Sequence, residues 1–219
     1  MTTVPFHPTC ARRWSTLSSS VSWAKTCGKK IIRLNLGYAC DDLARIAIQV
    51  ITALRALHEI GYSHCDIKPN NLASSRAGTA DAGTIYILDL GSARSWRAWR
   101  PWHINDPAGP NHRFVAACAH RGYGTGGRKG DLEALAYTLA WLATGVLPWD
   151  VVQYWTCAVQ ARDEMARMKE TVSPECLFLG LHPVFSRFYE EVRRTARNQK
   201  PRYAYILAMF ESALGEMTA

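Results

Sequence analysis

One stretch of sequence decides how the rest of the chain is interpreted: His64-Cys65-Asp66-Ile67-Lys68-Pro69-Asn70-Asn71-Leu72. It places the carboxylate of Asp66, the amine of Lys68 and the amide of Asn71 within six residues of one another. A short β-prone run, Ile85–Leu88, follows and ends at Asp89. Short apolar runs bounded by turn residues are typical of strands. The sequence therefore predicts two acidic side chains, Asp66 and Asp89, at the ends of elements that flank one loop.

These residue types at this spacing are typical of phosphoryl-transfer sites. A carboxylate such as Asp66 can orient a hydroxyl nucleophile and accept its proton. Asn71 and Asp89 carry hard oxygen atoms of the kind that Mg²⁺ takes beside nucleotide phosphates. A lone His-x-Asp is more often a structural pair. Here Lys68-Pro69 and Asn71 follow at fixed spacing in the same loop, and Asp-Leu-Gly comes after it. The sequence therefore predicts a site for Mg²⁺ and ATP, with ATP as substrate.

The loop has the form H-x-D-x-K-P-x-N, which resembles the catalytic loop of the eukaryotic protein kinases. Two further stretches, Gly130–Trp149 and Lys200–Leu207, resemble the central helix and the closing helix of the casein kinase I and vaccinia-related kinase branch. The resemblance covers about Gly37–Leu214. It implies the helical C-lobe of a serine/threonine protein kinase, which transfers the γ-phosphate of ATP to serine or threonine hydroxyls.

The resemblance also implies a role for each site residue. Asp66 would be the catalytic base, and Lys68 would steady the transferring phosphate as a point charge. Asn71 and Asp89 would bind Mg²⁺ and, through it, the nucleotide. Asp131 would be structural, with its carboxylate bonding to the backbone of the catalytic loop.

Hydrophobic periodicity predicts a mainly α (α+β) fold, a helical bundle with a short β ribbon at the catalytic loop. Apolar residues recur every three or four positions from Leu43 to Leu57, which indicates a helix that Asp41 or Asp42 caps and Gly61 ends. Further helices are expected at three places: Val151–Lys169, Pro183–Arg197 and Pro201–Leu214.

A second helix is expected to open at Asp131 and to be apolar on every face as far as Leu142. A helix without a polar face is buried on all sides, so this one should be the core of the domain. Asn71–Gly83 is small and polar and is predicted to be a loop.

Ser92–Gly130 is predicted to be a long functional loop in the place of a kinase activation segment. It holds seven basic residues against Asp106 alone: Arg94, Arg97, Arg100, Arg113, Arg121, Arg128 and Lys129. Such a charge excess attracts anionic partners, here an acidic or phosphorylated protein. Alternation of arginines with Trp96, Trp99 and Trp102 leaves nucleic-acid binding as a weaker alternative.

Residues 1–36 are predicted to be an irregular segment or hinge remnant, and 37–219 the kinase-like C-lobe, with the N-lobe absent or vestigial. No G-x-G-x-x-G can be built before Gly61, because the only earlier glycines are Gly28 and Gly37. No glutamate precedes Glu59 to partner an ATP-anchoring lysine. Catalysis is therefore expected to be impaired, and a pseudokinase scaffold is the alternative function.

Composition limits the class of protein. The 219 residues are 48% hydrophobic and 20% charged, without an apolar run of membrane-spanning length. Seven cysteines without Cys-x-x-Cys spacing suggest neither a zinc site nor a disulfide framework. We expect an intracellular protein, cytoplasmic or nuclear. Cys65 also stands where many kinases carry an arginine that receives an activation-loop phosphate, so control through that ion pair is not expected.

Overall fold

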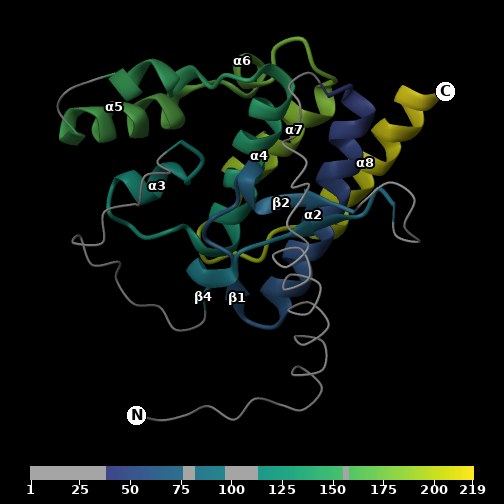
Figure 1. Ribbon diagram of the computed structural model, residues 1–219, viewed down its shortest axis with the longest axis horizontal. Helices are drawn as coiled ribbons and strands as arrows, with labels where there is room; N and C mark the ends of the chain where they lie inside the picture. The colour runs from purple at the N-terminus through teal and green to yellow at the C-terminus, as the bar shows by residue number, and fades with distance from the viewer. Residues whose placement is uncertain (1–37, 76–81, 97–112, 155–157) are drawn as a thin grey trace.

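The structure is a computed structural model that describes residues 38–75, 82–96, 113–154 and 158–219 (Figure 1). The segment predicted as irregular, 1–36, lies outside the described residues, as do Arg97 and Arg100, Trp99 and Trp102 of the basic loop. The described part is mainly helical, with two small antiparallel ribbons. The expected fold class is confirmed. Among the described residues, no helix combines the length and apolar character needed to cross a bilayer.

Helix α2 (Cys40–Glu59) confirms the first periodic segment. Its inward face consists of Leu43, Ala44, Ile46, Ala47, Val50, Ile51 and Leu54. The predicted capping residue is wrong, because Ala39 is the N-cap and no side chain caps this end. Asp41 and Asp42 lie in the first turn instead, where their charge favours the helix dipole. After the C-cap, Gly61 has φ 100°, a conformation that glycine adopts without strain.

Helix α4 (Gly127–Thr144) is the buried centre of the fold. It begins four residues before Asp131, so the predicted start is wrong. Position 130 in its first turn is packed too closely for a side chain, since a Cβ on Gly130 would lie 1.9 Å from the Thr125 carbonyl oxygen. Every residue from Gly130 to Ala140 is buried, which confirms the prediction of a helix without a polar face.

The C-terminal half wraps around α4 and differs from the sequence prediction in its boundaries. Instead of one helix over Val151–Lys169, a 3₁₀ turn η3 (Pro148–Tyr154) precedes α5 (Ala158–Thr171). The turn forms because Trp149 is fully buried and donates its indole N–H to the Arg113 carbonyl, which draws the chain inward. The remaining helices are α6 (Pro174–Leu177), α7 (Pro183–Arg194) and α8 (Tyr203–Thr218).

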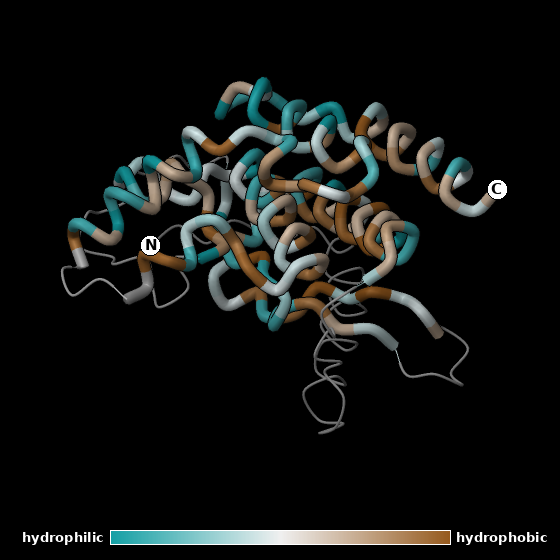
Figure 2. Tube along the Cα trace, turned by 90° about the horizontal axis from the view of Figure 1, so that it is seen from above, coloured by the Kyte–Doolittle hydropathy of each residue, from teal (hydrophilic) through white to brown (hydrophobic). Residues whose placement is uncertain are grey.

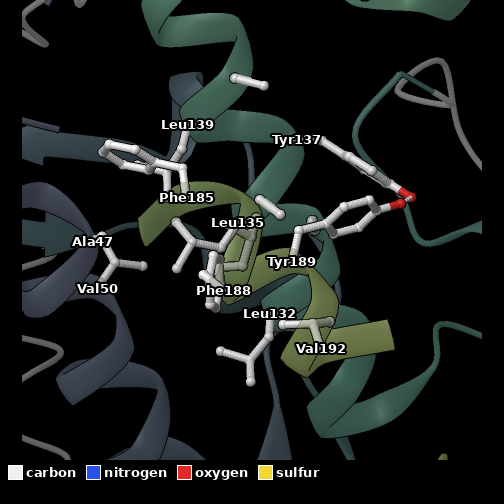
Figure 3. Close-up of a cluster of buried hydrophobic side chains, with 14 of the residues drawn as sticks. Ala47, Val50, Leu132, Leu135, Tyr137, Leu139, Phe185, Phe188, Tyr189 and Val192 are labelled. Carbon is white, nitrogen blue, oxygen red and sulfur yellow. Dashed lines mark hydrogen bonds between the residues drawn. The ribbon is translucent and has the colours of Figure 1, made fainter. Parts of the chain in front are cut away.

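Helices α2, α4, α7 and α8 share one hydrophobic core. Figure 1 shows α8 alongside α2 at one side of the molecule, and the hydrophobic residues in Figure 2 gather where these helices meet. In Figure 3, Leu132 and Leu135 of α4 face Phe188 of α7, while the hydroxyl groups of Tyr137 and Tyr189 point toward each other. Their oxygens lie 3.1 Å apart. This packed floor supports the loop that carries the candidate site.

Two ribbons fix the loop from either side. Strand β2 (Leu72–Ser74) pairs antiparallel with β3 (Ile85–Ile87), and β1 (Tyr62–Ser63) pairs with β4 (Arg94–Ser95). The assignment of Asn71–Gly83 to a loop is therefore wrong for β2. A three-residue strand is too short to show a periodic pattern, and it forms because β3 supplies its partner. Short 3₁₀ turns η1 (Pro69–Asn71) and η2 (Leu90–Ser92) adjoin this ribbon.

Candidate functional site

Buried and partly exposed residues alternate along the candidate catalytic loop, and the buried ones anchor it. Ile67 and Leu72 are 1% exposed and belong to the hydrophobic core, and Pro69 between them is also buried. Asp66 and Lys68 are partly exposed, with side-chain exposures of 19% and 13%. The apolar residues thus fasten the loop to the helical floor and leave the charged side chains at its surface.

The Asp131 carboxylate holds the start of this loop. Its Oδ2 accepts the backbone N–H of His64 at 2.6 Å, and its Oδ1 accepts that of Cys65 at 2.8 Å. Hydrogen bonds to a charged acceptor are stronger than neutral ones. They stabilise Cys65 at φ 66°, a left-handed conformation that disfavours non-glycine residues. The structural role that the kinase resemblance implied for Asp131 is confirmed.

His64 braces the loop from within. It is fully buried, its Nδ1 accepts the Asp66 N–H at 3.3 Å, and its Nε2 donates to the Leu88 carbonyl at 3.0 Å. A ring that accepts at one nitrogen and donates at the other is neutral, with its proton on Nε2. His64 therefore ties the Asp66 loop to the end of β3 and has no free nitrogen for proton transfer.

Three of the four predicted site residues are in direct contact. The Lys68 ammonium lies 2.6 Å from Asp66 Oδ2. The Asn71 amide donates to the same oxygen at 2.9 Å and to the Asp66 carbonyl at 2.8 Å. The loop thus brings a carboxylate, a cation and an amide to one point.

Asp89 reaches the same region through the backbone. The β2–β3 register pairs Leu72 with Ile87, and just beyond this pair the Leu88 N–H donates to the Asn71 carbonyl at 2.7 Å. Leu88 therefore lies opposite Asn71, and Asp89 is the next residue after Leu88. Asp89 is exposed and left-handed, with φ 61°. Its carboxylate accepts the Gly91 N–H at 3.2 Å within its own turn. No side-chain hydrogen bond joins Asp89 to Asp66 or Asn71 in the described part of the chain.

A small cleft opens beside Asp66, between the catalytic loop and the later part of the basic interval Ser92–Gly130, from Phe114 to Thr125. Its lining includes Asp66, Cys65, Phe114, Val115 and Thr125. The Thr125 hydroxyl lies 3.3 Å from the Cys65 sulfur. Burial raises the pKa of the Cys65 thiol to about 11, with the Asp131 charge adding to the effect, so this thiol is neutral at pH 7. Sequence patterns gave no sign of this contact, because Cys65 and Thr125 are sixty residues apart.

A buried lysine holds the far side of this segment. Lys169 of α5 is 1% exposed, and its Nζ donates to the Val115 carbonyl at 2.8 Å and lies 3.0 Å from His120 Nε2. Glu133 of α4 accepts the N–H of Ala117 at 2.8 Å, at the start of α3 (Ala117–His120). Sequence analysis missed both anchors, since a lysine on an amphipathic helix is normally solvent-exposed. The interval predicted as one long loop thus contains α3 and β4.

Four of the described basic residues in this interval divide into two groups. Arg113 forms an ion pair with Asp150, and Arg121 one with Glu170. Arg128 and Lys129 bond to carbonyl oxygens instead, those of Asn198 and Arg193. Of these four described cations, Arg113 and Arg121 have their charge offset by a carboxylate.

Trp96 is already engaged in the fold. The Arg128 guanidinium lies 3.9 Å from the centroid of its ring, and its indole N–H donates to the His58 carbonyl. Because a cation occupies one face of the ring, that face is closed to a nucleic-acid base. Nucleic-acid binding through Trp96, Trp99 and Trp102 stays a prediction, with one face of Trp96 already taken up within the fold.

Fold and site together define the described residues as the C-lobe of a protein-kinase-like domain. A casein kinase 1-like protein of rice (Oryza sativa subsp. japonica) is 32% identical over 178 residues, 78% of this chain and 24% of its own length. These curated relatives are casein kinase I proteins, and the chain corresponds to the C-terminal region of a casein kinase I-like serine/threonine kinase domain.

Two yeast proteins show the same similarity. Casein kinase I homolog 3 of Schizosaccharomyces pombe is 26% identical over 182 residues, 81% of this chain and 41% of the relative. Casein kinase I homolog 1 of Saccharomyces cerevisiae is 26% identical over 196 residues, 87% of this chain and 35% of the relative. The chain thus spans less than half the length of these curated relatives. No protein-family model matches it.

Proposed function

We propose that this chain carries the phosphoryl-transfer chemistry of a serine/threonine protein kinase and moves the γ-phosphate of ATP to a protein hydroxyl. The observation that supports this most is the contact of Asp66 with Lys68 and Asn71, beside a small cleft that Asp66 lines. The cleft beside Asp66 also offers the Thr125 hydroxyl and the apolar side chain of Phe114.

Asp66 would act as the base of this reaction. It would orient the substrate hydroxyl and accept its proton as the oxygen attacks the γ-phosphorus and the bond to the β-phosphate oxygen breaks. Lys68, already 2.6 Å from the Asp66 carboxylate, would lie close enough to place its charge on the transferring phosphate. The loop would therefore hold the proton acceptor, Asp66, beside the cation that contacts the phosphate, Lys68.

The chemistry of the donor atoms fits Mg²⁺. Asn71 donates to Asp66 through its nitrogen, so its carbonyl oxygen is oriented by two hydrogen bonds. Asp89 is exposed and would contribute a carboxylate, since it directly follows Leu88, the residue opposite Asn71 in the β2–β3 ribbon. Amide and carboxylate oxygens are the ligands that Mg²⁺ takes beside nucleotide phosphates. When bound, the ion would neutralise charge on the ATP phosphates, and Asn71 and Asp89 would hold it.

The rate of transfer should be low for the 219 residues by themselves. The stretch before Asp41 supplies no glycine-rich phosphate loop and no glutamate for an ATP-anchoring lysine. Loss of one preorganised electrostatic contact commonly costs on the order of 10²–10³ in rate. The catalytic loop and the β2–β3 ribbon would supply the floor of the nucleotide site, and the reaction would be slow.

Transfer of radiolabelled γ-phosphate to casein, measured in Mg²⁺ with the purified chain, tests this function. Asp66→Asn is the matched control, because it keeps the size and hydrogen-bonding shape of the side chain while removing the base. We expect slow incorporation by the wild type that is at least about tenfold above the variant. Equal incorporation by the two proteins would remove the catalytic proposal.

The alternative is a catalytically inactive pseudokinase scaffold that binds acidic or phosphorylated protein partners. The cations that bond to carbonyl oxygens, Arg128 and Lys129, favour this alternative as its binding surface. A thermal-shift titration with Mg²⁺ and ATP separates the two hypotheses. An ATP-dependent rise in melting temperature that Asp89→Asn abolishes supports the kinase. Identical melting curves with and without nucleotide leave the scaffold.

A further inference from the structure

Three buried polar side chains from three different helices form a continuous hydrogen-bonded chain. Tyr203 of α8 is 3% exposed, His58 of α2 is 2% exposed and Asp131 of α4 is 1% exposed. The Tyr203 hydroxyl is hydrogen-bonded to His58 Nδ1, and His58 Nε2 lies 2.8 Å from Asp131 Oδ2. Buried polar groups at such a junction of helices are stable only when each is satisfied.

One arrangement of protons satisfies the whole chain with neutral Tyr203 and His58. Asp131 can only accept, so His58 Nε2 carries a proton and donates it to the carboxylate. His58 Nδ1 then accepts from the Tyr203 hydroxyl. Burial raises the pKa of that hydroxyl well above 10.0, which keeps its proton in place. Asp131 therefore fixes which nitrogen of His58 is protonated, and the Tyr203 hydroxyl holds the other nitrogen and so fixes how the ring is turned.

The chain ends on the catalytic loop. The same Asp131 carboxylate that receives His58 also accepts the N–H groups of His64 and Cys65, the two residues immediately before Asp66. Cys65 needs this support because of its left-handed backbone, a conformation that costs on the order of 1 kcal/mol or more in a non-glycine residue. Any rotation of the carboxylate would release that strain by moving Asp66.

We propose that Tyr203 is a remote positioning residue for Asp66, acting through His58 and Asp131. Loss of the hydroxyl leaves His58 Nδ1 buried without its donor, so the ring turns or draws in water and Asp131 loses its fixed N–H. The two loop amides then bond to a less constrained acceptor, and Asp66 samples more positions. The effect on phosphate transfer rests on the proposed function, whereas the effect on the loop does not.

Hydrogen exchange resolved by mass spectrometry tests the coupling without any assay of activity. Tyr203→Phe removes only the hydroxyl. Tyr205→Phe is the matched control, since Tyr205 lies two residues away on the same helix, is 49% exposed and stacks on Arg202. In Tyr203→Phe we expect the amides of the peptide that contains His64 and Cys65 to exchange about tenfold faster. Peptides from α7 and the Tyr205→Phe protein should exchange as in the wild type.

A second comparison, made in a His58→Gln protein, distinguishes this coupling from a general destabilisation of the fold. In a His58→Gln protein the link from α8 to Asp131 is already broken, so adding Tyr203→Phe should change exchange at His64 and Cys65 by less than about twofold. Equal acceleration in both backgrounds would overturn the proposal. Uniform acceleration across α4 and α7, or no acceleration at His64 and Cys65, would overturn it as well.

Phosphate transfer then separates this inference from the proposed function. With an active wild type, Tyr203→Phe should lower kcat about tenfold while KM for ATP changes less than about twofold, because positioning of the base is lost and not nucleotide binding. An unchanged kcat with faster exchange at the loop overturns the positioning of Asp66. If no protein exceeds the Asp66→Asn control, the proposed function fails, and the exchange result alone decides whether Tyr203 orders the loop.

Discussion

The Asn71 side-chain amide donates two hydrogen bonds to Asp66, one to its backbone carbonyl at 2.8 Å and one to its carboxylate at 2.9 Å. A single residue thus fixes both the main chain and the side chain of the proposed base. It does so with its nitrogen and so aims its oxygen away from Asp66. Asn71 is 6% exposed, which makes the loss of either bond expensive.

Asn71→Ala should therefore lower both stability and activity. Two acceptors on Asp66 lose a buried donor, so we expect the free energy of unfolding in urea to fall by about 1–3 kcal/mol. Transfer to casein should fall with it, because Asp66 is no longer oriented. Asn198→Ala is the control, since that side chain is exposed. A stability for Asn71→Ala equal to that of Asn198→Ala would show that the two bonds do not form in solution.

Gly130→Ala should be severely destabilising. A Cβ at this position would lie 1.9 Å from the Thr125 carbonyl oxygen, so the turn that carries Thr125 would have to move. We expect a loss of about 2 kcal/mol or more, since overpacking of a rigid site commonly costs 1–3 kcal/mol. Gly215→Ala in α8 meets nothing within 4 Å and should stabilise by about 0.5–1 kcal/mol. Thermal unfolding of the two variants measures this contrast, and similar melting temperatures would contradict the packing.

Lys169 should make stability depend on pH. Burial lowers the pKa of its ammonium group well below 10.5, against the opposing influence of Glu133, Asp150 and Cys118. The unfolded chain then binds more protons than the folded one at any pH between the folded pKa and about 10.5, so stability rises with pH there. Burial raises the pKa of the Cys65 and Cys118 thiols to about 11, so both remain protonated in the folded protein between about pH 7 and about pH 8.5. This range is therefore suited to the measurement.

The measurement compares melting temperatures across that range of pH. The rise should be larger for the wild type than for Lys169→Met, which has no proton to release. Lys200→Met is the control, because Lys200 is exposed and should leave the wild-type slope unchanged. A Lys169→Met protein with the wild-type slope would mean that the buried ammonium group is not the cause.

The described cysteines should differ sharply in reactivity. Burial raises the pKa of the Cys65 and Cys118 thiols to about 11 from 9.0, which lowers their thiolate content about 100-fold near neutral pH. Cys176 is exposed. Because the thiolate is the nucleophile, iodoacetamide should alkylate Cys176 at least about tenfold faster than Cys65 or Cys118. Peptide mass spectrometry follows the three sites, and rapid alkylation of Cys65 would show that its thiol is not buried in solution.

Local sequence patterns predict the site better than they predict its supports. The H-x-D-x-K-P-x-N loop and the Asp at the end of a β-prone run are short motifs, so the sequence alone predicts that Asp66, Lys68 and Asn71 belong to one site. The position of α4 as a buried helix follows from the apolar residues that occupy nearly every position from Leu132 to Leu142. Each of these features is local in the chain.

The features that the sequence does not reveal depend on distant partners. Lys169 looks like a surface lysine until the carbonyl of Val115, fifty-four residues away, is known to accept its hydrogen bond. His58 looks like one of the polar residues that end an amphipathic helix, yet its bonds to Asp131 and Tyr203 span 73 and 145 residues. The start of α4 at Gly127 was missed because glycines normally end helices.

The account is tested most directly by calorimetric titration of ATP into the purified chain, with and without Mg²⁺. If Asn71 and Asp89 hold one metal-nucleotide site beside Asp66, the wild type should bind ATP only when Mg²⁺ is present. Asp89→Asn should lose most of this binding, and Asp66→Asn should retain it, because Asp66 serves the transfer step. Binding that ignores Mg²⁺, or that Asp89→Asn leaves intact, would contradict the assignment of the site.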